Sequence, residues 1–154
     1  MKKFNYLFFL FLFAVNCGYQ PIYTNQKSLN FKLKEVILIG DKKINQKILN
    51  FTNLKKNSSD NNALDISIET SQIRNISSKD NSGNPLTYQM SLSSKLIVKI
   101  NNNLTDQTTF TSSFSYSNKE NKFDLREYEK NILEDLIRSN SEKITTYLSL
   151  RKWL

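Results

Sequence analysis

An alternation of apolar and polar residues between positions 88 and 100 constrains the fold of this chain more than any other feature. One set of alternating positions is apolar: Tyr88, Met90, Leu92, Leu96, Val98 and Ile100. The other set is polar except for Ile97: Gln89, Ser91, Ser93, Lys95 and Lys99. Successive side chains of a strand point to opposite faces of its sheet. This segment therefore predicts a strand with one buried and one exposed face.

Three further segments have the character of strands. Residues 31–39 begin with alternation and end as a solid apolar run, and Leu64–Glu69 alternate in a strand that we expect to extend toward Ile76. One face of a fourth strand is marked by Phe110, Ser112, Phe114 and Tyr116. Polar turns at 77–85 and 101–103 are short, so the second, third and fourth strands are predicted to form an antiparallel meander.

Two other segments repeat every three or four residues, which is typical of amphipathic helices. The first is predicted at about 42–54, with Asp41 capping its free amide groups and one apolar stripe: Ile44, Ile48, Phe51 and Leu54. The second is predicted from Phe123 to Leu150, with Asp124 as its expected cap, and Ser139-Asn140-Ser141 could bend or divide it. Its stripe comprises Leu125, Tyr128, Ile132, Leu133, Leu136, Ile137, Ile144, Tyr147 and Leu148.

The predicted order of elements is β-α-β-β-β-α, which indicates an α+β fold. A sheet with one apolar face needs cover, and two helices with single apolar stripes supply it. We therefore expect a two-layer sandwich in which two helices cover a four-stranded, largely antiparallel sheet. Residues 31–154 are predicted to form this single domain.

The N-terminal residues have the layout of a signal peptide. Lys2 and Lys3 precede an apolar run from Tyr6 to Val15. That run is too short to cross a bilayer, which takes about 20 residues. Residues 1–16 are therefore predicted to be removed on export, and the mature chain would begin at Cys17.

Cys17 is the only cysteine, and it lies where the apolar run ends. An exported free thiol is a liability unless it is capped, and Ala14-Val15-Asn16-Cys17 resembles the lipobox at which bacterial lipoproteins are acylated. Asn16 departs from the small residue usual at its position. We expect Cys17 to carry a diacylglycerol and an N-linked acyl chain such as palmitate, with residues 17–30 as a tether. The alternative is ordinary cleavage that leaves the thiol unmodified.

Composition excludes most kinds of active site. Histidine is absent and the cysteine is single, so the sequence lacks Ser-His and Cys-His nucleophile pairs and the usual zinc ligands. Its three glycines, Gly18, Gly40 and Gly83, cannot form a phosphate-binding loop. No catalytic residue, metal or cofactor is therefore predicted. A hydrolase that uses two carboxylates is the enzyme class left open.

The chain is basic, which favours anionic partners. It has 22 basic and 14 acidic residues, and loss of Lys2 and Lys3 would leave 20 and 14, a net charge of +6. Such a surface attracts nucleic acid, anionic lipid or the phosphates of lipopolysaccharide. Export argues against nucleic acid.

The segment Cys17-Gly18-Tyr19-Gln20-Pro21-Ile22-Tyr23 resembles the start of mature LptE, the lipopolysaccharide-assembly lipoprotein, in its alphaproteobacterial form. The predicted element order and the long final helix agree with that family. The resemblance implies a lipoprotein of membrane biogenesis, anchored on the periplasmic side of the outer membrane. It also implies a β-barrel partner, LptD, which such a protein plugs and helps to assemble for lipopolysaccharide transport to the cell surface.

Four lysines are candidate contacts to lipopolysaccharide, although no family motif assigns them. Lys95 and Lys99 lie on the polar side of the alternating strand, and Lys119 and Lys122 precede the last helix. The alternative for each is an ordinary solvated lysine. The alternative for the whole protein is a periplasm-facing lipoprotein that binds a small molecule or peptidoglycan, or has a structural role.

Overall fold

A computed structural model describes residues 31–60 and 62–153. The predicted signal peptide (1–16) and the tether with Cys17 (17–30) lie outside the described residues. The elements follow the predicted order: β1 (Leu33–Ile39), α2 (Lys42–Thr52), β2 (Leu64–Lys79), β3 (Pro85–Ile100), β4 (Asn103–Ser117) and α3 (Lys122–Leu150).

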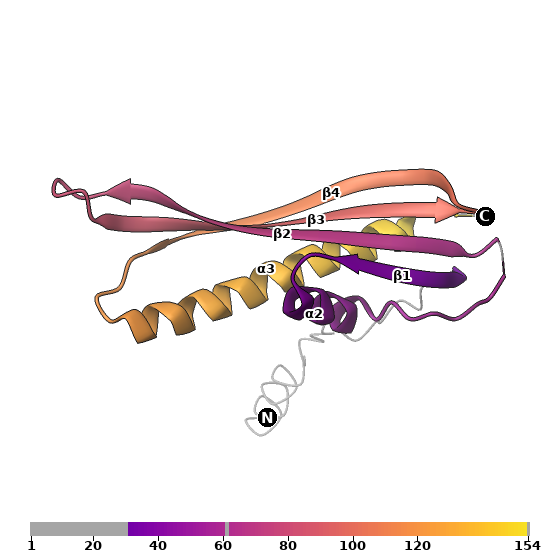
Figure 1. Ribbon diagram of the computed structural model, residues 1–154, viewed down its shortest axis with the longest axis horizontal. Helices are drawn as coiled ribbons and strands as arrows, with labels where there is room; N and C mark the ends of the chain where they lie inside the picture. Colours follow the sequence, from indigo (N-terminus) through magenta and orange to yellow (C-terminus); the bar gives the residue numbers. More distant parts are fainter. Residues whose placement is uncertain (1–30, 61, 154) are drawn as a thin grey trace, which may run out of the picture.

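The strands form one four-stranded sheet in the order β1-β2-β3-β4. Strands β2, β3 and β4 pair antiparallel, whereas β1 pairs parallel to β2. Parallel neighbours need a crossover, and α2 provides it between β1 and β2. Both helices lie on the same side of the sheet (Figure 1). The predicted α+β sandwich with a largely antiparallel sheet is therefore confirmed.

The junction between β1 and α2 depends on Gly40 and Asp41. Gly40 has φ +109°, and a Cβ there would lie 2.3 Å from the backbone oxygen of Thr70, so a larger residue does not fit. Asp41 caps α2 as predicted, because its Oδ1 accepts from the amides of Lys43 at 2.8 Å and Ile44 at 3.0 Å.

Helix α2 ends at Thr52, two residues before the predicted end, because Asn53 adopts a left-handed conformation with φ 52°. Its buried stripe also differs from the prediction. Phe51 is 40% exposed, and the buried positions include Asn45 and Thr52. The Thr52 hydroxyl can be buried because it donates to the backbone oxygen of Ile48 at 2.8 Å.

The β2–β3 hairpin is longer than the sequence predicts. Both strands have 16 residues, and the turn spans only residues 80–84 instead of 77–85. Residues 71–79 are exposed on both faces of the sheet, so burial imposes no alternation there. Asp80 shapes the turn, because its Oδ1 accepts from the amides of Ser82 at 2.9 Å and Asn84 at 2.8 Å.

Helix α3 is one continuous element of 29 residues, so it is not divided at residues 139–141. Ser141 donates to the backbone oxygen of Ile137 at 2.8 Å, which keeps its hydroxyl within the helix. The predicted cap is also wrong. Asn121, not Asp124, caps the helix, accepting from the amide of Phe123 at 2.9 Å. Asp124 lies in the first turn, where its charge favours the positive end of the helix dipole.

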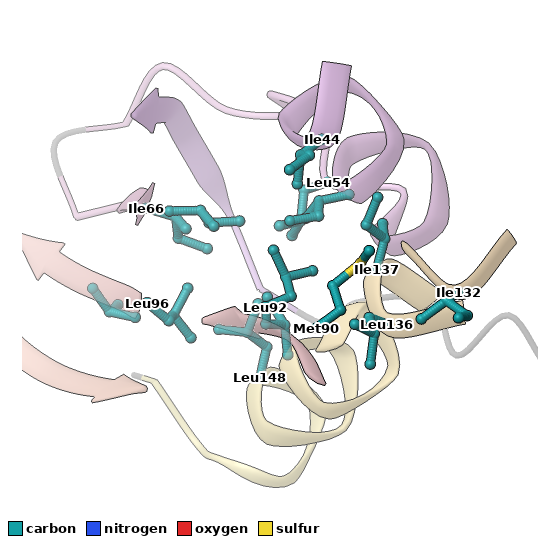
Figure 2. Packing of buried hydrophobic residues seen from close by; sticks show 14 of the residues in the cluster. Ile44, Leu54, Ile66, Met90, Leu92, Leu96, Ile132, Leu136, Ile137 and Leu148 are labelled. Carbon is teal, nitrogen blue, oxygen red and sulfur yellow. The ribbon is translucent and has the colours of Figure 1, made fainter. Parts of the chain in front are cut away.

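The core lies between the sheet and the two helices (Figure 2). The predicted apolar face of β3 is buried, with Leu92 and Leu96 at 0% and Val98 at 1% exposure, whereas Ile100 is half-buried. The predicted face of β4 is correct, because Tyr116 is buried. Phe114 on the same face is nevertheless 47% exposed, on a strand that forms the edge of the sheet.

Candidate functional site

The sheet face opposite the helices is uncovered within the described part of the chain. It is mainly polar, with three exposed isoleucines of β1 and β2 as exceptions: Ile37, Ile39 and Ile73. We call it the open face. The strand register places Ser71 of β2, Ser93 of β3 and Thr111 of β4 side by side, and none of the three is buried. The open face is formed mainly by Ser67, Ser71, Gln89, Ser91, Ser93, Lys95, Lys99, Thr109, Thr111 and Ser113. Hydroxyl groups are therefore the commonest polar groups of the open face.

Lys95 and Lys99 lie on the open face, each directly opposite an acidic residue of β2. Lys95 pairs in register with Glu69, and Lys99 pairs with Asp65. Opposite charges in such cross-strand positions favour one another. The Oδ1 atom of Asp65 is buried with no hydrogen-bond partner among the described residues. The acidic neighbours offset part of the positive field of both lysines.

At the end of the molecule where β3 begins, which we call the far end, Lys119 lies in the connection between β4 and α3, and Lys122 is the first residue of α3. The Nζ atom of Lys119 is 4.4 Å from the ring centre of Tyr128. The Nζ atom of Lys122 is 3.4 Å from the backbone oxygen of Lys119 and 3.4 Å from Oδ1 of Asn118. These two lysines are near the start of β3, whereas Lys99 is near its end. The structure therefore separates the four predicted contacts into two places.

A polar cluster beside this end was not predicted from the sequence. Arg74 of β2 donates through Nε to Glu129 of α3 at 2.7 Å, and the hydroxyl of Tyr116 donates to the same carboxylate at 2.7 Å. The Arg74 guanidinium also stacks on the ring of Tyr88 at 3.8 Å. Burial, with the hydrogen bond to Glu129, raises the pKa of Tyr116 to about 12.

The alternation of β2 could have drawn attention to Arg74 in the sequence. Arg74 falls on the same side of the strand as the buried residues Leu64, Ile66, Ile68 and Thr70. A charged side chain on the face that meets the helices can pair with an opposite charge from the helix layer. The sequence does not show that this partner is Glu129, because 55 residues separate the two.

Within residues 31–60 and 62–153, no group of three or more potential ligands is placed to hold a metal ion. In the same residues, no helix combines the length and apolar character needed to cross a membrane. The carboxylates of Asp60, Asp80 and Asp106 are each engaged in local hydrogen bonds.

By sequence, no family model and no curated protein matches this chain. Solved structures do match it. Rare lipoprotein B from Shewanella oneidensis aligns with a TM-score of 0.60 at 12% identity, over 74% of this chain and 92% of that chain. A minor lipoprotein from Acinetobacter baumannii aligns with a TM-score of 0.56 at 15% identity, over 78% of this chain and 93% of that chain.

Lipoprotein B from Nitrosomonas europaea gives a similar result, with a TM-score of 0.58 at 12% identity over 77% of this chain and 83% of that chain. At such identities the likeness shows the fold alone. The domain thus has a fold that is also found in bacterial lipoproteins, and it spans most of their length.

Proposed function

We propose that this protein is an outer-membrane lipoprotein, acylated at Cys17, that plugs an LptD-like β-barrel from the periplasmic side. In this role it assists assembly of the barrel and transport of lipopolysaccharide to the cell surface. Two independent features support the proposal. The segment from Cys17 to Tyr23 resembles the start of mature LptE, and the domain shares its fold with solved lipoproteins.

The polar open face gives the strongest structural support to the proposal. An uncovered sheet face contacts whatever surrounds the domain, so its polarity must match that environment. The lumen of a large barrel is polar. The hydroxyl groups of Ser71, Ser93 and Thr111 suit such a wall. The outward side of α3 is also charged, with Arg126, Lys130 and other ionisable residues exposed. Both broad sides of the domain are therefore fit to contact a polar lumen.

The lysines at the far end are the better candidates for contacts to lipopolysaccharide phosphates. Lys119 and Lys122 lie together, whereas Lys95 and Lys99 each face a carboxylate across the sheet. Because these side chains are exposed, salt should weaken the contact.

Co-isolation from outer membranes in mild detergent tests the proposed partner directly. We expect a one-to-one complex with a large β-barrel. Depletion of the protein should lower correctly assembled barrel and surface lipopolysaccharide together. A photo-crosslinking residue at Ser113 on the open face should label the barrel. The same residue at Leu96, which is buried, is the matched control and should not label it.

Recovery of the protein alone, with normal barrel assembly after depletion, would contradict the barrel-plug role. That result would favour the other class, a lipoprotein that binds a small molecule or peptidoglycan. Lys119→Gln with Lys122→Gln tests the lipopolysaccharide contact separately. This double variant should keep the barrel complex but bind lipopolysaccharide more weakly than the matched Lys95→Gln with Lys99→Gln.

A further inference from the structure

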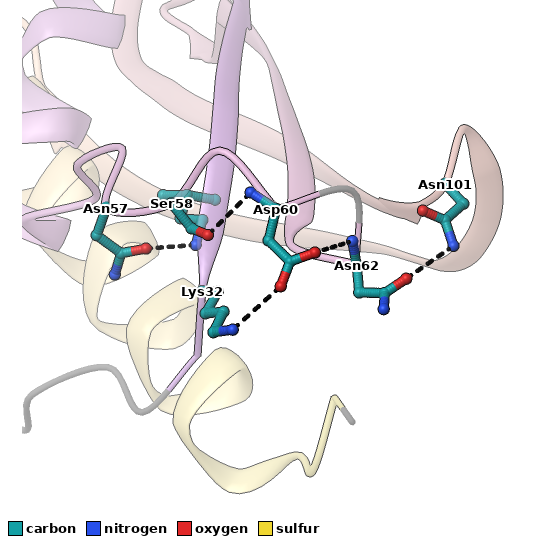
Figure 3. Close-up of polar contacts among 7 residues, drawn as sticks. Lys32, Asn57, Ser58, Asp60, Asn62 and Asn101 are labelled. Carbon is teal, nitrogen blue, oxygen red and sulfur yellow. Dashed lines mark hydrogen bonds and ion pairs between the residues drawn. The ribbon is translucent and has the colours of Figure 1, made fainter.

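Four segments far apart in the sequence meet at one end of the molecule, where the chain enters β1 (Figure 1). They are the start of β1, the α2–β2 connection, the β3–β4 turn and the end of α3. Figure 3 shows the contacts that join the first three. Asn101 donates through Nδ2 to Oδ1 of Asn62 at 3.2 Å, and Lys32 pairs with Asp60 at 3.1 Å. We call this the entry end.

The entry end carries an excess of positive charge. Two of its basic residues have acidic partners, because Lys32 pairs with Asp60 and Arg151 pairs with Asp106. Lys55, Lys56 and Lys152 are exposed, and none of these three lies within ion-pairing distance of a carboxylate of the described residues. Among the described residues, three ammonium groups at this end therefore have no carboxylate partner.

The same end presents apolar and aromatic side chains. Leu104 is 62% exposed and Leu150 is 74% exposed. Trp153 is the only tryptophan of the chain, and its indole nitrogen donates to the backbone oxygen of Leu148 at 2.9 Å. This hydrogen bond holds the half-buried ring at the end of α3. Tryptophan favours the membrane–water interface, where its ring is apolar and its N–H remains bonded.

The entry end is also the place where the N-terminal chain joins the domain. Residues 17–30 precede Phe31, and 14 residue steps of 3.3–3.6 Å span at most about 50 Å. A lipid on Cys17 would keep the domain near a bilayer. A basic surface with a tryptophan supplies the second attachment that orients a protein on an anionic membrane.

We propose that the entry end lies on anionic phospholipid headgroups, with Lys55, Lys56 and Lys152 near the phosphates and Trp153, Leu104 and Leu150 at the interface. The contact does not require a barrel partner, so it can be tested independently of the proposed function.

Vesicle binding tests the contact, using the chain from residue 17 onward with Cys17→Ser so that no acyl chain contributes. Every described element lies in residues 31–153, so this change leaves the core intact. We expect binding to vesicles that contain phosphatidylglycerol, weakening as salt rises, and little binding to vesicles of phosphatidylethanolamine and phosphatidylcholine alone. The emission of Trp153 should shift to the blue and be quenched by brominated acyl chains.

A pair of matched double variants locates the contact. Lys55→Gln with Lys56→Gln should weaken binding to the anionic vesicles roughly 30-fold, because each lysine near the surface contributes about a fivefold factor. Lys42→Gln with Lys43→Gln removes the same charge at the exposed start of α2, away from the entry end, and should leave binding unchanged. Circular dichroism should show that both variants are folded.

Three results would overturn the proposal. Equal loss of binding in both double variants would mean that net charge alone attracts the protein to the vesicles. Binding without any change in Trp153 fluorescence would place the contact elsewhere on the domain. Binding only when lipopolysaccharide is present in the vesicles would assign the surface to that lipid instead of to phospholipid.

Discussion

The buried side-chain amide of Asn140 in α3 donates a hydrogen bond to the backbone oxygen of Leu92 in β3 at 3.0 Å. It also donates to the hydroxyl of Ser94 at 3.0 Å, while its Oδ1 accepts from the hydroxyl of Ser112 at 2.7 Å. These bonds can form at only one axial position of the helix. Asn140 therefore fixes the register of α3 across the sheet.

Asn140→Ala should destabilise the protein by about 1–3 kcal/mol, because it removes hydrogen bonds to the backbone oxygen of Leu92 and to the buried hydroxyl of Ser94. Urea unfolding followed by circular dichroism measures the change. Asn131→Ala, at an exposed position of the same helix, is the matched control and should cost less than about 0.5 kcal/mol. Equal costs would show that Asn140 does not anchor the helix.

Leu96→Ala should cost about 2–5 kcal/mol in the free energy of unfolding, because it opens a cavity under the centre of the sheet. Leu96 is 0% exposed, whereas Ser93 of the same strand lies on the open face. Ser93→Ala should therefore change stability by less than about 0.5 kcal/mol. Similar effects of the two changes in denaturant unfolding would contradict the assigned faces of β3.

Gly40→Ala should destabilise the protein by more than about 1 kcal/mol, since the backbone is in a conformation that only glycine adopts freely. The new Cβ would also lie 2.3 Å from the backbone oxygen of Thr70. Gly83→Ala is a control with a similar backbone angle, φ +84°, but no atom within 4 Å of the added Cβ. Thermal unfolding should show the larger loss for Gly40→Ala, and the reverse order would contradict this view of the junction.

Asp106 should contribute to the loss of stability in acid. The hydrogen bond from the hydroxyl of Tyr147, with the nearby Arg151, holds the pKa of Asp106 below its usual range. A carboxyl whose folded pKa is lowered stabilises the protein above its unfolded pKa of about 4. That stabilisation disappears as pH falls through the lower folded value.

Unfolding free energies measured from pH 6 down to pH 2 check this expectation. The acid-dependent loss should be smaller in Asp106→Asn than in the unmodified protein. Asp135→Asn removes an exposed carboxyl of α3 and should leave the pH profile nearly unchanged. If both variants keep the profile of the unmodified protein, Asp106 is not part of the acid response.

Cys17 should be the acylated N-terminus of the mature protein. Mass spectrometry of protein isolated from membranes should find a chain that begins at Cys17 and carries the mass of a diacylglycerol and one further acyl chain. Cys17→Ser should abolish the lipid. An intact signal, or an unmodified Cys17 thiol, would show that the chain is not a lipoprotein.

The faces and order of the elements could be predicted because they follow from local periodicity. The alternation from Tyr88 to Ile100 identifies β3 and its buried side without reference to any other segment. The Asp41 cap was also predictable, since the capping side chain and the amides it bonds are within three residues. Where local patterns were ambiguous, the predictions erred, as at Phe51 and at the ends of the β2–β3 hairpin.

Contacts between distant segments could not be predicted, because no local pattern specifies which partner a residue will meet. The parallel pairing of β1 with β2, the bond from Arg74 to Glu129 and the role of Asn140 all arise when the helix layer packs on the sheet. In the sequence, Asn140 resembled a weak point of the helix. In the folded chain it is stable there because Leu92, Ser94 and Ser112 satisfy its amide, and an amide in an apolar core is tolerated only when its hydrogen bonds are made.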